Sequence, residues 1–124
     1  MEIKGLNEAS QKIHKASKLK GFYEKPREIG TLLMLVVSEL SEALEADRKN
    51  RYASDMPTVL LHSDLDTFPE IFKGNVKDTF EDEIADAIIR LFDLCGYMNI
   101  DIEKHIDLKL KYNQGRPAKH GKNY

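Results

Sequence analysis

The sequence predicts an all-α protein, a bundle of four to five helices. Apolar residues recur at helical spacing in four segments, and Gly and Pro residues separate these segments. No run of residues has the alternation that is typical of a β-strand. Helices joined in this way pack into a bundle. The length of 124 residues suits one modest core, so we expect a single domain over residues 1–124.

The first two helices are expected at about residues 6–20 and 26–50. The first has an apolar stripe near the helical period and ends at Gly21, since glycine is favoured just after a helix. Pro26 suits the first turn of the second helix. The second helix has a wide apolar face, broad enough to be buried on more than one side. This face comprises Leu32, Leu33, Val36, Val37, Leu40, Ala43 and Leu44.

Residues 51–77 break the helical pattern and are expected to form a long inter-helix loop. Within this loop, residues 67–72 are consistent with one short helix that has Thr67 as its cap. A loop of this length is uncommon in a small domain and usually has a function or lacks order.

The last two helices are expected at about residues 78–95 and 102–110. Asp78 and Glu81 resemble a capping box at the start of the first of these helices. Asp101 is expected to cap the second.

Charge is distributed unevenly along a chain whose formal net charge is only −2. Residues 78–86 hold five acids and no base, whereas residues 104–122 hold six bases and one acid. Residues 113–124 form a basic tail, rich in helix breakers, which we expect to be mobile unless a ligand orders it. A cation site and an anion-binding segment on one small domain suggest a ligand that carries both metal and phosphate.

Two acidic pairs at helical spacing define the candidate site. Glu39 and Glu42 are three positions apart, as are Glu83 and Asp86, so each pair lies on one face of its helix. Both pairs border apolar stripes, where a carboxylate is half shielded. If the two helices face each other, these four residues, which we call the acidic quartet, form one pocket. Like charges held so closely take up protons or a cation. Oxygen ligands favour Mg²⁺, with Mn²⁺ or Ca²⁺ as alternatives.

Four interpretations of these residues compete. Solvated, idle acidic pairs are the ordinary explanation of any one pair. A di-iron carboxylate bundle is set aside because the chain has no Glu-x-x-His. A nucleic-acid polymer is a poor partner for a short basic tail on a slightly acidic chain. A Mg²⁺-dependent hydrolase of a phosphate ester or anhydride uses both charged features. Without a Gly-rich phosphate loop, metal and side chains would have to hold the phosphates.

The same composition points to a reducing, aqueous compartment. Cys95 is the only cysteine, so an internal disulfide is excluded. We expect Cys95 to be a buried, inert thiol. The longest apolar run, at 32–37, is too short to span a membrane. The first residues lack the apolar stretch of a signal peptide. We therefore expect a cytoplasmic protein with no membrane partner.

Three segments, in this order, resemble the MazG-like, all-α nucleoside triphosphate pyrophosphohydrolases over roughly residues 5–124. They are Ser-Glu-Leu-Ser-Glu-Ala-Leu-Glu at 38–45, Glu-Asp-Glu-Ile-Ala-Asp-Ala-Ile-Ile-Arg at 81–90 and Lys-Tyr-Asn-Gln-Gly-Arg-Pro-Ala-Lys-His-Gly-Lys at 111–122. The resemblance implies an oligomeric bundle of the all-α NTP pyrophosphatase type. It also implies Mg²⁺-dependent cleavage of an NTP or dNTP between the α and β phosphates. The products would be a nucleoside monophosphate and pyrophosphate, in the cleaning of the nucleotide pool.

The resemblance further implies roles for single residues. The acidic quartet would bind the metal, and either Glu39 or Glu42 would also orient or deprotonate the attacking water. Family members assemble as homodimers or as homotetramers, with the site near the interface. Four polar residues would bind the substrate phosphates, the last of them in the same subunit or a neighbouring one: Lys109, Asn113, Arg116 and Lys122.

The chain departs from the family pattern in two places. Ser38 stands where the family often has a further acid, so the number of bound metals is open. The segment between the two acidic pairs is longer than usual and is a candidate lid, substrate-selecting loop or oligomer contact. The alternative function, from another class, is a non-catalytic helical module for dimerisation or for nucleotide or metal binding on the same scaffold.

Overall fold

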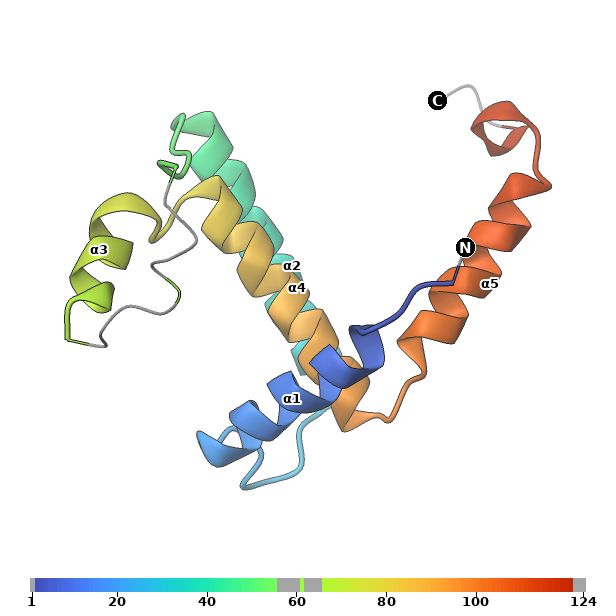
Figure 1. The fold of residues 1–124 in the computed structure, drawn as a ribbon, viewed down its shortest axis with the longest axis horizontal. Coiled ribbons are helices and arrows are strands. Elements are labelled where there is room, and N and C mark those ends of the chain that lie inside the picture. The colour runs from blue at the N-terminus through green and yellow to red at the C-terminus, as the bar shows by residue number, and fades with distance from the viewer. Residues whose placement is uncertain (1, 56–60, 62–65, 122–124) are drawn as a thin grey trace. The chain divides into compact units, whose positions relative to one another are not determined.

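The structure, a computed structural model, describes residues 2–55, 61 and 66–121, and its α-helices are shown in Figure 1. In chain order the elements are α1 (Leu6–Leu19), α2 (Ile29–Arg48), α3 (Phe68–Asn75), α4 (Phe80–Tyr97), α5 (Ile102–Gln114) and the 3-10 helix η2 (Ala118–Gly121). Over these described residues there is no strand, which confirms the all-α prediction. A membrane crossing would need a longer or more apolar helix than any found in this part of the chain.

The chain divides into two compact units. The α1–α5 unit comprises Met1–Pro26 and Phe92–Tyr124, and the α2–α4 unit comprises Arg27–Leu91. Helix α4 contributes residues 80–91 to the α2–α4 unit and residues 92–97 to the α1–α5 unit.

In the α2–α4 unit, the two long helices lie side by side and run antiparallel (Figure 1). Arg90, late in α4, bonds to Glu39 in the middle of α2, and Phe80, at the start of α4, donates its N–H to the Arg51 carbonyl just beyond α2. Small residues line the contact and let the helices approach closely. The buried residues of this core are Leu32, Val36, Ala43 and Ala46 of α2 with Ala87 of α4.

The apolar face of α2 is wider than the core that α4 covers. Leu33, Val37 and Leu40 are each almost half exposed, and Met34 is 62% exposed. Within the described part of the α2–α4 unit, α4 therefore covers one side of this face and leaves these four side chains largely exposed.

In the α1–α5 unit, α1 crosses the end of α4 at Gly96. A β-carbon at Gly96 would lie 2.6 Å from the His14 Cβ and 2.7 Å from the Ser10 carbonyl oxygen, so only glycine permits this crossing. Neighbouring Cys95 is buried, as expected for an inert thiol. Helix α1 is joined to the start of α5 by reciprocal bonds, in which the Asn7 N–H donates to Glu103 Oε1 and the Glu103 N–H donates to Asn7 Oδ1.

One predicted helix start and one predicted cap need correction. Helix α2 begins at Ile29 after Glu28, whose backbone is extended, so Pro26 precedes the helix and is not in its first turn. In the segment between α1 and α2, Tyr23 packs against His14 and Tyr97. The centroid of the Tyr23 ring lies 4.7 Å from the centroid of each of the other two rings. Helix α3 begins after Thr67, but the Thr67 side chain makes no capping hydrogen bond.

The capping of α4 also differs from the prediction. Because the helix starts at Phe80, the residue before it is Thr79, and Asp78 with Glu81 is out of register for a capping box. Thr79 Oγ1 accepts the Asp82 N–H, and Asp82 Oδ2 accepts the Asp78 N–H. For α5, the cap is confirmed: Asp101 accepts the Lys104 N–H at 3.2 Å, and the helix continues past residue 110 to Gln114.

Candidate metal centre

The acidic quartet meets where α2 and α4 pair. One carboxylate oxygen from each of Glu39, Glu83 and Asp86 lies within 4.8 Å of the others. The Glu42 carboxyl lies within hydrogen-bond reach of the Glu39 and Glu83 carboxyls. Glu39 and Glu83 are buried, whereas Glu42 is exposed at the edge of the cluster. The structure thus brings together all four residues that the two i, i+3 spacings nominated.

Glu83 is the most buried residue of the quartet and has the largest pKa shift. Burial raises its pKa to about 8, and the neighbouring carboxyls of Glu42 and Glu39 add to the shift. Its Oε2 atom is buried and has no hydrogen-bond partner. Burial, and then the negative charge of Asp82, also raises the pKa of Asp86. Both carboxyls therefore hold a proton more tightly than usual until a cation replaces it.

Arg90 is a member of the site to which the sequence analysis assigned no role. Its Nε donates to Glu39 Oε1 at 3.0 Å. Burial alone would raise the pKa of Glu39, but the bond and charge of Arg90, together with hydrogen bonds from Glu83 and Glu42, outweigh burial, and the pKa falls below its usual value. The sequence feature that could have identified Arg90 as a site residue is its position four residues after Asp86, on the same helical face.

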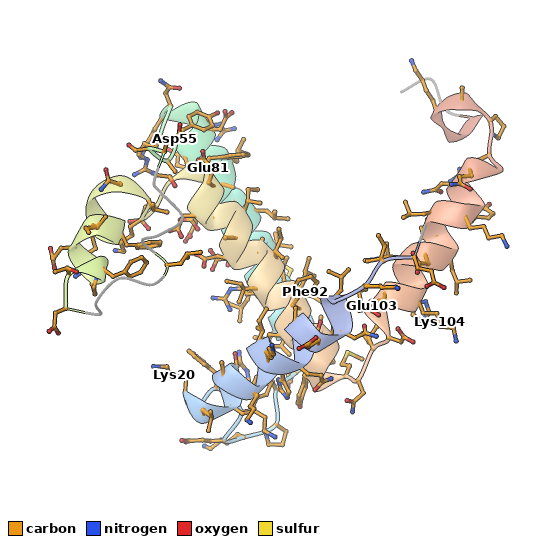
Figure 2. The ribbon with its side chains drawn as sticks, in the orientation of Figure 1. Lys20, Asp55, Glu81, Phe92, Glu103 and Lys104 are labelled. Carbon is orange, nitrogen blue, oxygen red and sulfur yellow. The ribbon has the colours of Figure 1, made fainter. Side chains whose placement is uncertain are left out.

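Glu81, another acid at the start of α4, makes a contact outside the quartet. Glu81, labelled in Figure 2, directs its side chain to the segment after α2, where Oε1 accepts the Ala53 N–H at 2.9 Å. This contact gives Glu81 a structural role outside the quartet.

The donor atoms of the quartet fit a hard divalent cation. All are carboxylate oxygens, the ligands that Mg²⁺ and Mn²⁺ prefer. The Arg90 guanidinium contacts the quartet through its bond to Glu39. The Oε2 atom of buried Glu83 has no hydrogen-bond partner, and because a buried acceptor without a partner is costly, a cation or a donor bound there would be stabilising.

None of the predicted phosphate-binding residues belongs to the described part of the α2–α4 unit, which holds the quartet. Lys109, Asn113 and Arg116 belong to the α1–α5 unit, and Lys122 lies outside the described residues. Lys109 Nζ and Arg116 Cζ lie 5.2 and 5.4 Å from the centroid of the Tyr112 ring. The Asn113 Oδ1 atom is buried without a hydrogen-bond partner. Contact between these residues and substrate phosphates therefore stays a prediction.

Comparisons of the chain with protein-family models, with curated proteins and with solved structures find no match. Membership of the MazG-like family accordingly stays a prediction from the sequence resemblance.

Proposed function

We propose that the protein is a Mg²⁺-dependent nucleotide pyrophosphohydrolase. It would cleave an NTP or dNTP between the α and β phosphates, releasing a nucleoside monophosphate and pyrophosphate, in cytoplasmic nucleotide-pool cleaning. The observation that supports this proposal best is the buried carboxylate cluster of α2 and α4, with a partnerless oxygen on Glu83. Such a cluster needs a positive ligand, and a hard cation suits its oxygen donors.

The cation would be held by Glu39, Glu83 and Asp86, with Glu42 at the open edge. When bound, Mg²⁺ neutralises phosphate oxygens and lowers the pKa of a bound water. Of the two candidates for handling the attacking water, the geometry favours Glu42. Glu39 Oε1 is occupied by Arg90, whereas the Glu42 carboxyl faces solvent, where water enters and a proton leaves.

The remaining charge of the nucleotide would be bound by Lys109, Asn113 and Arg116, with Lys122 from the same or a neighbouring subunit. This assignment follows the family resemblance. Two of these residues gather around the Tyr112 ring, which would let one phosphate chain contact both.

The open side of α2 supports a homodimer or homotetramer. Leu33, Met34, Val37, Leu40 and Leu44 are each between 46 and 62% exposed and follow one helix. A contiguous apolar face of this kind is costly in water and is typical of an oligomer interface. The same face favours the alternative function, a non-catalytic helical dimerisation or nucleotide- or metal-binding module.

A pyrophosphate-release assay separates the two functions. Ribo-, deoxy- and modified nucleoside triphosphates would be incubated with the protein in Mg²⁺, in Mn²⁺ and in chelator. We expect release from at least one nucleotide with Mg²⁺ and none with chelator. No release across the panel, from protein shown to be helical by circular dichroism and oligomeric by sedimentation, would overturn the hydrolase and leave the module.

A further inference from the structure

We propose that Arg90 of α4 binds a phosphate group of the substrate, while its bond to Glu39 holds it beside the acidic quartet. This inference rests on the proposed function, because it gives that reaction a phosphate-binding residue within the α2–α4 unit. The ligand class is a di- or triphosphate that binds together with a divalent cation. Arg90 is not among the four phosphate-binding residues that the family resemblance implies.

The contacts of Arg90 place it beside two of the expected metal ligands. Its Nε donates to Glu39 Oε1 at 3.0 Å, from one long helix of the unit to the other. Burial raises the pKa of Asp86, and the charge of Arg90, one helical turn later, opposes that rise. Arg90 therefore adjoins a carboxylate of α2 and a carboxylate of α4 that would hold the cation.

The bond to Glu39 uses only part of the hydrogen-bonding capacity of Arg90. A guanidinium has five N–H donors in a planar fork, and the contact described for Arg90 uses Nε. The Arg90 side chain is 40% exposed, whereas the Glu39 side chain is 11% exposed. Arg90 can therefore keep its bond to buried Glu39 and offer its Nη groups to a ligand that enters from solvent. Paired, planar donors of this kind match two oxygens of one phosphate.

The Arg90–Glu39 pair differs from the other ion pairs described in the α2–α4 unit. Those pairs join exposed residues within four positions of each other, and such pairs contribute little. They are Arg48 and Lys49 with Glu45, Lys73 with Glu70, and Lys77 with Asp78. Arg90 instead reaches across two helices to a buried carboxylate of the quartet, where charges are screened least.

A phosphate at the quartet needs positive charge beyond that of one cation. Once the quartet is ionised, its four carboxylates carry more negative charge than one Mg²⁺ neutralises, so an approaching phosphate is repelled. Arg90 offsets part of this charge from within the same unit. The ordinary explanation, in which Arg90 only joins α2 to α4, accounts for the bond to Glu39 but makes no use of the exposed part of the side chain.

Binding of magnesium pyrophosphate, a product of the proposed reaction, tests this role without turnover. The affinity is measured by isothermal titration calorimetry with the same excess of Mg²⁺ in the cell and in the syringe. We expect the parent protein to bind pyrophosphate and Arg90→Gln to bind it at least about 10-fold more weakly, the loss typical of one charge-assisted hydrogen bond. Arg90→Lys keeps the charge but not the planar fork, so its affinity should fall by less.

Binding of Mn²⁺ alone, measured by electron paramagnetic resonance of the free ion, separates this role from a purely structural one. Arg90→Gln should bind Mn²⁺ at least as tightly as the parent, because the substitution frees Glu39 Oε1. The matched control is Arg48→Gln, which removes an exposed arginine of α2 whose described partner is Glu45. This control should keep the parental affinity for both pyrophosphate and Mn²⁺.

The outcomes distinguish this proposal from the proposed function. Parental pyrophosphate affinity in Arg90→Gln with unchanged helical content, or in Arg90→Lys where that variant alone folds, would overturn the phosphate role of Arg90 and leave the hydrolase. A parent protein that binds no pyrophosphate would also overturn that role, as would an equal loss of Mn²⁺ and pyrophosphate binding in Arg90→Gln. A selective loss of pyrophosphate binding, in a protein that hydrolyses no nucleotide, would support the role and overturn only the hydrolase.

Discussion

The carboxylates of the two units differ in their hydrogen-bond partners. In the α1–α5 unit, Asp93 interacts with His14 Nδ1 and accepts from Ser17 Oγ, each at 2.9 Å. Asp107 accepts the Ile3 N–H, and Asp101 accepts from the Asn7 side chain and the Lys104 N–H. In the α2–α4 unit, the carboxyl of buried Glu83 interacts with the carboxyls of Glu42 and Glu39, and its Oε2 atom has no hydrogen-bond partner.

This difference distinguishes carboxylates that stabilise the fold through hydrogen bonds from carboxylates that are available to bind a ligand. A buried acceptor is stabilised by donors, and the α1–α5 unit supplies them from its own backbone and side chains. The α2–α4 unit supplies one arginine to a cluster of four acids. Among the described residues, the α2–α4 unit therefore has a buried carboxylate oxygen without a hydrogen-bond donor, at Glu83.

The largest expected effect is on metal-dependent turnover. Asp86→Ala and Glu42→Ala should each lower Mg²⁺-dependent pyrophosphate release by more than about 100-fold, since even an outer partner of a metal site is worth about 10–100-fold. Circular dichroism should show an unchanged helical content. The control is Asp107→Asn, an acid of the other unit, which should keep full turnover. Full activity in Asp86→Ala would show that the quartet is not the catalytic site.

The second expected effect is on stability against pH in metal-free protein. Glu83 has a folded pKa of about 8 against an ordinary value of 4.5. Between these values the unfolded chain has released its proton and the folded chain keeps it, so raising the pH favours unfolding. The contribution of Glu83 is complete below pH 4.5 and is lost as the pH rises through about 8. The raised pKa of Asp86 acts in the same direction.

This trend can be measured as the melting temperature in chelator from pH 5 to pH 9. The parent should melt at progressively lower temperature up to about pH 8, and Glu83→Gln should flatten the decline. The lowered pKa of Glu39 has the opposite sign, but its stabilisation is lost only on acidification below about pH 4.5, outside the range. Mg²⁺ should restore the parent most at high pH. A melting temperature that is independent of pH in chelator would contradict the buried, protonated Glu83.

Sequence periodicity was sufficient to predict the helices and to nominate the quartet, because a stripe of apolar residues and an i, i+3 acidic pair are properties of a single helix. Periodicity was not sufficient to identify Arg90 as a residue of the site. An arginine on the margin of a helix has many uses, and only the pairing of α2 with α4 shows that it reaches Glu39. The same limit applies to capping, since a shift of one residue in the start of α4 moved the pair from Asp78 and Glu81 to Thr79 and Asp82.

Residues far apart in the chain set a further limit. The sequence pattern predicted a helix over about 102–110 with a tail after it, whereas α5 continues to Gln114. The pattern says nothing of where the end of this helix meets a nucleotide. Pairing of distant segments depends on tertiary packing, which local patterns do not contain.

The smallest expected effect is on the stability of the α1–α5 unit, and it has the opposite sign to the effect in the other unit. Asp93→Ala removes the partner of both His14 Nδ1 and Ser17 Oγ, and should lower the free energy of unfolding by about 1–3 kcal/mol, the cost of leaving such groups unsatisfied. Urea unfolding in chelator at pH 8 measures this change. Asp93→Asn, which keeps one acceptor oxygen, should lose less.

Under the same conditions, Glu83→Gln should raise the free energy of unfolding, because it removes a carboxyl that burial and its neighbours disfavour in the charged form. Loss of a carboxylate would thus destabilise the protein at Asp93, which has donors, and stabilise it at Glu83, whose Oε2 atom has none. If both substitutions lowered stability by similar amounts, Glu83 would be a structural acid like Asp93. The burial of Glu83 would then give no physical reason for a cation at the acidic quartet.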